Sequence, residues 1–144
     1  MERDERITDY TGEIISSFGD SQREIQAKLG NPVKVESKKV QNEHDPAVTD
    51  TIVILKYDGI DFGLFVSGYS DGPVRVISMN CTSKKYKLKH LNIGDGMEKI
   101  RNQLGEPNER ESDYIQYDSD FAILMIYHDK KNIVTRVEGS IFLD

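Results

Sequence analysis

The sequence lacks a long apolar run, and this absence limits how the chain can meet a membrane. No stretch approaches the roughly 18 consecutive apolar residues of a membrane-spanning helix, so no membrane span is expected. The first residues, Met1-Glu2-Arg3-Asp4-Glu5-Arg6, also lack the apolar core of a signal peptide. This start fits a cytoplasmic protein, and it fits equally an exported protein whose signal segment or lipid anchor has been removed.

Cysteine and net positive charge are also scarce. The one cysteine, Cys81, excludes an internal disulfide framework, and its place at the end of an expected strand favours a small, half-buried residue over a reactive thiol. The 144 residues include 25 acidic and 19 basic ones, which gives a net charge of −6. Because nucleic-acid binding demands a basic surface, this balance argues against a nucleic-acid partner.

The sequence has no recognisable catalytic or metal-binding constellation. His44, His90 and His128 are scattered, and none pairs with another at the spacing of metal ligands. A nucleophile pair of Cys81 and His128 would need a third orienting group and an oxyanion site, and neither is visible. We therefore expect no metal, no cofactor and no catalytic residues, and we interpret the chain as noncatalytic.

What the sequence does contain is a tandem repeat. Residues 19–37 and 94–112, offset by 75, are identical at eight of nineteen positions without a gap. The identical residues of the first copy are Gly19, Asp20, Ile25, Leu29, Gly30, Pro32, Glu36 and Ser37.

Each copy predicts one short helix with marked ends. Ser21 and Asp95 are the expected N-caps, each with a glutamate three residues later that completes a capping box. Gly30 and Gly105 supply the left-handed position after a helix, and a proline follows two residues later. A further helix is expected over 5–18, where apolar residues approximate helical spacing.

Strands follow each of these helices. Alternating, β-branched and aromatic runs predict strands over 33–40, 51–57, 62–67 and 74–80, with hairpin turns at Asp58-Gly59-Ile60-Asp61 and Ser70-Asp71-Gly72-Pro73. After a basic, solvated connector over 83–90, further strands are expected over 109–117, 121–127 and 132–142.

These elements predict an α+β fold of two tandem repeats, residues 1–82 and 83–144, in one compact unit. In each repeat a helix pair packs on a three- to four-stranded antiparallel sheet, and the sheets join into one concave surface. The side of that sheet away from the helices would expose aromatic residues, which are typical anchors of protein interfaces. The candidates are Tyr57, Phe65, Tyr69, Tyr114, Tyr117 and Tyr127.

The repeated motif, a hydrophobic-Gly-Asp turn followed by Ile and then Leu-Gly-x-Pro, resembles that of the β-lactamase-inhibitor-protein-like superfamily. The outer-membrane assembly lipoproteins of the SmpA/OmlA type share one copy of this unit. The resemblance implies a helix pair on an antiparallel sheet in each repeat, export from a bacterial cell, and binding to proteins through the concave face. It also implies contacts from the turn after the second strand, which corresponds here to Asp58-Gly59-Ile60-Asp61.

The resulting hypothesis is a noncatalytic protein-binding module of the bacterial cell surface or envelope. Its expected partner is another protein, and its expected binding residues are Asp58, Asp61, Phe65, Tyr69, Tyr114 and Tyr127. Two alternatives stay open: a sensor that binds a small ligand or peptide on the same face, and a cytoplasmic enzyme that uses Cys81.

Overall fold

The computed structural model describes residues 2–69 and 74–142, so the turn expected at Ser70-Asp71-Gly72-Pro73 lies outside the described residues. Within the described ranges the chain forms three helices and eight strands. They are α1 (Arg3–Ile15), α2 (Gln22–Leu29), β1 (Lys34–Gln41), β2 (Thr49–Tyr57), β3 (Ile60–Val66), β4 (Val74–Cys81), α3 (Glu98–Leu104), β5 (Glu109–Arg110), β6 (Tyr114–Asp118), β7 (Ala122–His128) and β8 (Val134–Ile141).

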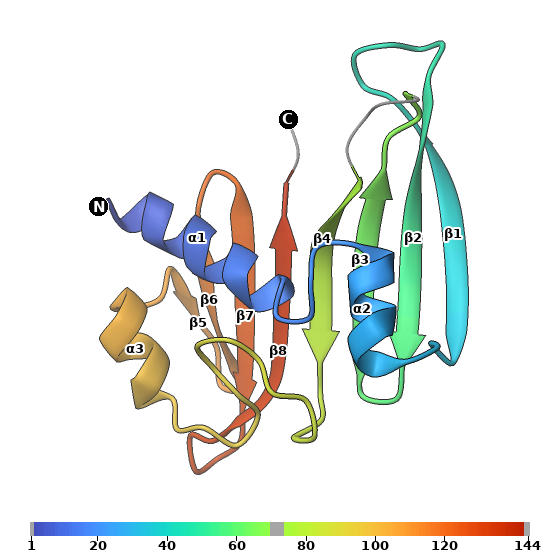
Figure 1. The fold of residues 1–144 in the computed structure, drawn as a ribbon. Coiled ribbons are helices and arrows are strands. Elements are labelled where there is room, and N and C mark those ends of the chain that lie inside the picture. The colour runs from blue at the N-terminus through green and yellow to red at the C-terminus, as the bar shows by residue number, and fades with distance from the viewer. Residues whose placement is uncertain (1, 70–73, 143–144) are drawn as a thin grey trace.

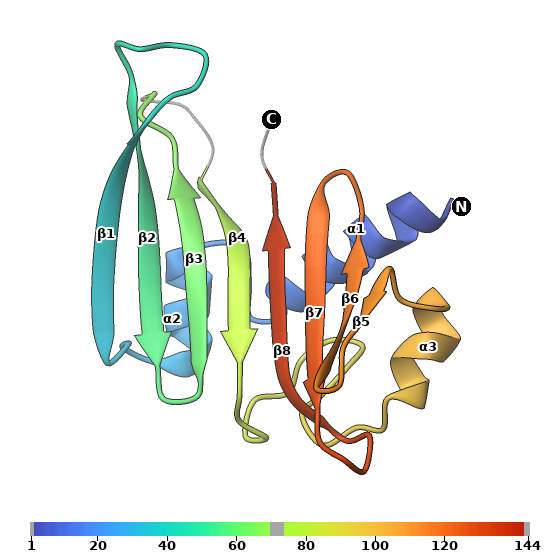
Figure 2. The same cartoon turned by 180° about the vertical axis from the view of Figure 1, so that it is seen from behind.

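All of these strands belong to a single antiparallel sheet in the order β1-β2-β3-β4-β8-β7-β6-β5. The two halves of the chain meet where β4 pairs with β8, from Ser78 opposite Ser140 to Cys81 opposite Val137. Figure 1 shows the helices on one side of this sheet, and Figure 2 shows the other side from behind. The predicted α+β class and the joining of the strands into one sheet are therefore confirmed.

The expected helix pair is found in the first half and is wrong for the second half. In the described part of residues 83–144 the chain forms one helix, α3. Asp95 is not its N-cap: the Asp95 carboxylate instead accepts a hydrogen bond from the Asn92 N–H at 2.8 Å, and α3 begins only at Glu98. The connector has no helical spacing, because its apolar residues alternate with lysines; Tyr86 and Leu88 are buried while Lys85 and Lys87 are exposed.

Helix α1 crosses from the first half of the chain to the second half of the sheet. Its buried stripe of Ile7, Tyr10, Thr11, Ile14 and Ile15 packs against β7 and β8 (Figure 1). Helix α2 lies over the first half instead. The helix nearest the N-terminus therefore covers strands made by the last third of the chain.

The two repeated helix ends have the same local geometry. Gly30 and Gly105 each have φ +81°, with ψ −163° and −156°, a conformation that glycine adopts without steric cost. A tyrosine hydroxyl donates to each glycine carbonyl oxygen, from Tyr57 to Gly30 at 2.8 Å and from Tyr117 to Gly105 at 2.7 Å. Ser21 caps α2 as expected by accepting the Glu24 N–H at 3.2 Å.

The core lies between the sheet and the elements on its helix side. Leu55, Phe62, Met79, Leu124 and Tyr117 face this side and are buried, and strand pairing places them in one row that crosses the sheet.

The expected strand over 109–117 is split into β5 and β6. The chain turns between them, where the Glu111 N–H donates to the Tyr114 carbonyl at 2.9 Å.

Candidate functional site

The candidate site is the side of the sheet that faces away from the helices, which we call the open face (Figure 2). Directly paired residues of antiparallel strands share a face, so the pairing register identifies its members. One row runs Ile54, Gly63, Ser78, Ser140 and Ile123. The next row runs Lys56, Asp61, Asn80, Glu138, Met125 and Gln116.

An aromatic and cationic cluster occupies the second half of this face. The rings of Tyr114 and Tyr127 lie 5.4 Å apart between centroids. The Arg136 guanidinium lies 4.9 Å from the Tyr127 ring centroid, an arrangement that favours the cation. Arg136 also donates to the Asn80 side-chain oxygen at 2.8 Å and to Glu138 at 3.0 Å. Tyr127, Arg136 and Glu138 are each held by a neighbour, so this cluster is already organised before any partner binds.

A shallow hollow of about 200 Å³ lies beside this cluster, over the junction of the two halves. Its lining includes the small residues Gly63, Ser78 and Ser140 and the acidic residues Asp61 and Glu138. Partial burial raises the pKa of Asp61 above its ordinary value; Lys56 opposes this shift and Glu36 reinforces it. Among the described residues, Asp61 has no hydrogen-bond or ion-pair partner, so its carboxylate is available to a donor.

The other end of the open face is apolar. A hollow of about 500 Å³ lies between the β1–β2 loop and the end of β8. Ile52, Phe65, Ile77 and Phe142 supply its apolar surface, and Asn42, Glu43, His44 and Asp50 supply its polar rim. The open face thus changes along the strands from an apolar end to a charged and aromatic end. A solvated antiparallel face is ordinarily polar, so the apolar end is a candidate contact surface.

The six residues predicted for binding do not form one patch. Asp61, Phe65, Tyr114 and Tyr127 are on the open face, but Phe65 belongs to its apolar end. Tyr69 lies beyond β3, where its hydroxyl donates to Asp45 of the β1–β2 loop at 3.1 Å.

Asp58 lies in the β2–β3 turn, at the other end of β3 from Tyr69, and its side chain is almost fully exposed. Two other aromatic candidates are not on the open face. Tyr57 shares the helix side with Leu55, and Tyr117 is fully buried there.

Sequence reasoning missed Arg136 and the isoleucines of the open face. Alternation within β8 was enough to place Arg136 and Glu138 on one side of the strand. That Asn80 and Tyr127 are the neighbours of Arg136 could not be predicted without the strand pairing, because they lie 56 and 9 positions before it in the sequence.

Cys81 lies on the helix side and is fully buried. Burial raises the pKa of its thiol, against a smaller opposing effect of the Ser83 backbone. A nucleophilic cysteine needs a lowered pKa and access, so this environment does not favour the Cys81 hypothesis. Within residues 2–69 and 74–142, no group of three or more His, Cys, Asp or Glu side chains is placed to hold a metal ion.

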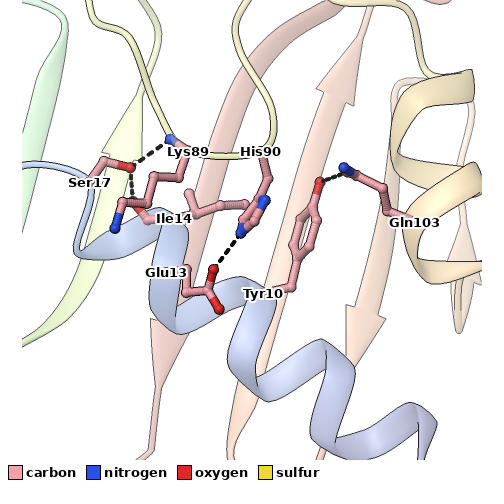
Figure 3. Close-up of polar contacts among 7 residues, drawn as sticks. All are labelled: Tyr10, Glu13, Ile14, Ser17, Lys89, His90 and Gln103. Atoms are coloured by element: carbon pink, nitrogen blue, oxygen red, sulfur yellow. Dashed lines mark hydrogen bonds and ion pairs between the residues drawn. The ribbon is translucent and has the colours of Figure 1, made fainter. Parts of the chain in front are cut away.

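A second polar cluster, shown in Figure 3, holds the connector onto α1 and has a structural explanation. The His90 ring stacks on Tyr10 at 4.7 Å between centroids, and its Nε2 lies 2.6 Å from Glu13. The Tyr10 hydroxyl donates to Gln103 of α3 at 2.6 Å. The Lys89 N–H donates to the Ser17 hydroxyl oxygen at 3.0 Å. This cluster joins α1, the connector and α3, so we assign it to the fold.

Comparison with known proteins gives a likeness of fold only. No family model matches the chain, and no curated protein matches it. The structure is similar to that of an extracellular protein containing a SCP domain from Bacillus anthracis str. Ames, with a TM-score of 0.56 and 10% sequence identity. The match covers 91% of this chain and 46% of that one, so this chain spans about half the length of that protein.

A second solved structure that matches the chain is that of a DUF4309 family protein (YjgB) from Bacillus subtilis subsp. subtilis str. 168. Its TM-score is 0.44 at 13% identity, and the match covers 95% of this chain and 99% of that one. Separately, none of the described helices is long and apolar enough to cross a membrane.

Proposed function

We propose that the chain is a noncatalytic module of the bacterial cell surface or envelope that binds another protein through its open face. The observation that carries this proposal is the composition of that face. Ile52, Ile54, Phe65 and Ile123 stand on it, although none of the described helices covers it. Burying apolar side chains of this kind under a partner is favourable, by about 25 cal/mol per Å² of apolar area removed from water.

The cluster of Tyr114, Tyr127 and Arg136 supports the same proposal. Tyrosine and arginine are enriched among the residues that dominate binding energies at protein interfaces. Because Arg136 is held by Asn80 and Glu138, ordering it on binding costs little conformational entropy. The exposed Asp58 turn, next to the end of this face, would add a polar contact at the margin.

The location is proposed from the fold and from the sequence resemblance. An extracellular protein of Bacillus anthracis contains a region of similar fold. Two tandem units related to the β-lactamase-inhibitor-protein-like and SmpA/OmlA-type proteins would be exported, some of them as lipoproteins. The matching glycine conformations at Gly30 and Gly105, and the matching tyrosine bonds to them, support a duplicated unit.

Site-specific photo-crosslinking tests the proposal. A benzoylphenylalanine at Tyr127, in the centre of the aromatic cluster, should crosslink a protein from surface extracts of the source organism. The same probe at Arg23, which is exposed on α2 on the helix side, is the matched control. A Phe65→Ser/Tyr114→Ala variant carrying the Tyr127 probe should lose the product while keeping its unfolding temperature. Equal products from both probe positions would contradict a role for the open face.

The apolar hollow favours a second candidate, a sensor of small ligands. Its volume of about 500 Å³ lies within the range of small-molecule sites, and it combines an apolar surface with a few polar groups. A ligand screen by thermal shift should then find compounds that raise the unfolding temperature of the wild type. Phe65→Ala should abolish that shift, whereas Tyr127→Ala, at the other end of the face, should preserve it.

A further inference from the structure

The sheet has one long free edge and one short one. Strand β1 forms the long edge, with eight residues paired to β2 on one side only. The opposite edge is β5, which has two residues. Within the described ranges no strand pairs with the outer side of β1, and its residues are mostly exposed.

The pairing with β2 shows which backbone groups of β1 point outward. The Asn42 N–H donates to the Val48 carbonyl at 3.0 Å, one step beyond the pair Gln41 and Thr49. Hydrogen-bonded and non-hydrogen-bonded pairs alternate in an antiparallel ladder, so even-numbered residues bond to β2. The N–H and C=O groups of Val35, Ser37 and Lys39 therefore point away from the sheet and can pair with another strand.

The side chains of this edge carry positive charge. Strand β1 has three lysines, Lys34, Lys38 and Lys39, and one acidic residue, Glu36, in a chain whose net charge is −6. Glu36 is already engaged, at 3.0 Å from the Lys34 ammonium and 3.3 Å from that of Lys56. Lys38 and Lys39 form no ion pair within the described residues, so the outer half of β1 attracts a negatively charged strand.

An apolar strip borders the same edge on the helix side. Val33 and Val35 are 80% and 51% exposed, and Val35 shares its face with the buried Leu55. A strand added beside β1 would place its own apolar residue against Val35 and extend the core outward.

We propose that the β1 edge binds an extended acidic segment of a partner protein by antiparallel strand addition. This site is the backbone edge of the sheet and not the open face itself, although Lys34 and Lys38 point to the open side of β1. It goes beyond the function proposed above. Pairing with a second copy is disfavoured, since it would bring two lysine-rich strands together, and edge lysines commonly prevent such pairing. The same lysines therefore repel the β1 strand of a second copy and attract an acidic strand of a partner protein.

A designed peptide tests the site directly. The peptide, with both ends capped, is Thr-Val-Glu-Glu-Thr-Lys-Val-Glu, and it is designed to pair antiparallel with β1, its first residue opposite Gln41 and its last opposite Lys34. In this register its glutamates face Lys39, Lys38 and Lys34, and its second valine faces Val35. In the ¹⁵N-labelled chain of residues 1–144, this peptide should shift the amide signals of Val35, Ser37 and Lys39 and slow their hydrogen exchange. The charge-reversed peptide Thr-Val-Lys-Lys-Thr-Glu-Val-Lys is the control and should leave them unchanged.

Two variants separate backbone pairing from charge. Ser37→Pro removes one outward N–H and breaks no hydrogen bond to β2, which is why proline is tolerated on edge strands. It should abolish peptide binding. Ser37→Ala keeps the N–H, is the matched control, and should bind the peptide normally. Lys38→Glu/Lys39→Glu should weaken binding about tenfold, from two cross-strand pairs turned repulsive. This double variant leaves the outward N–H groups in place, so it tests the site even if Ser37→Pro disturbs the fold.

Three results would overturn the proposal. The first is an acidic peptide that leaves the β1 amides unshifted, and the second is equal binding of the charge-reversed peptide. The third is a concentration-dependent shift of the β1 amides without peptide, because it would mean that a second copy occupies the edge. None of these results depends on the open face, so crosslinking at Tyr127 stays a separate test.

Discussion

At the scale of single residues, the two tyrosine bonds to the helix-ending glycines differ in burial. The Tyr117 hydroxyl lies in the core and donates to the Gly105 carbonyl, whereas the equivalent bond of Tyr57 is exposed to water. Tyr117→Phe should lower the free energy of unfolding by about 1–2 kcal/mol, because the carbonyl loses its donor. Tyr57→Phe is the matched control and should cost at most about 0.5 kcal/mol, since water replaces the hydroxyl. Urea denaturation of both variants measures the difference, and equal costs would contradict it.

Cys81 allows a second prediction at this scale. Its thiol is buried and its pKa is raised, so little thiolate is present or accessible at neutral pH. Iodoacetamide should modify the native chain at least about a hundredfold more slowly than the urea-unfolded chain, in which the thiol has its ordinary pKa. Mass spectrometry of timed samples follows the reaction. Rapid modification of the native chain would instead restore the hypothesis of an activated nucleophile.

At the scale of elements, the contact of α1 with β8 depends on a glycine. A Cβ on Gly139 would lie 2.9 Å from Ile15 Cγ2 and 3.3 Å from Thr11 Cγ2, so it would push the helix off the strand. Gly139→Ala should therefore destabilise the chain by about 1–3 kcal/mol, the usual cost of overpacking. Gly96→Ala is the control, since a Cβ there meets no atom within 4 Å. Its effect on the unfolding temperature should be close to zero, and an equal loss at both sites would contradict the role of Gly139.

At the scale of the whole molecule, the two halves depend on each other. The buried stripe of α1, from the first half, packs on β7 and β8 of the second half, and β4 pairs with β8. Separate fragments 1–82 and 83–144 would each expose part of this core. We expect neither fragment to unfold cooperatively alone, and an equimolar mixture to recover the circular dichroism of the intact chain. A cooperative transition of 83–144 by itself would show that α1 is dispensable.

Local chemistry in the sequence was sufficient to predict most elements. Ser21, Gly30, Gly105 and the Asp58-Gly59 turn act within a few residues, so their roles could be read directly and agree with the structure. The helix pair expected in the second half was wrong. The motif at Gly94-Asp95 is followed by a helix, α3, as in the first copy, but the connector before the motif has no helical spacing. Helix α1, from the other end of the chain, packs on β7 and β8.

The candidate site was predictable only in part. Alternation alone places Tyr114 and Tyr117 of one strand on opposite faces, so the expectation that both stand on the open side was wrong for one of them. Packing against the helices, which the sequence does not show, decided that Tyr117 is the buried one. The six residues proposed for binding include four that share the open face, although they stand at different ends of it. Their separation follows partly from the strand order, in which β3 and β7 are divided by β4 and β8. It follows also from position along one strand, since Asp61 and Phe65 lie near opposite ends of β3.

The sequence by itself determined the antiparallel α+β class, the N-cap of α2, the glycines that end α2 and α3, and the Asp58-Gly59 hairpin turn, because caps, glycines and alternation act over short distances. Only the tertiary structure decided that β4 pairs with β8, that α1 covers the second half, and that β1 is left as a lysine-rich edge. These features depend on packing between residues far apart in the chain. Burial of one side of a continuous sheet decides them, and no single segment of the sequence carries that information.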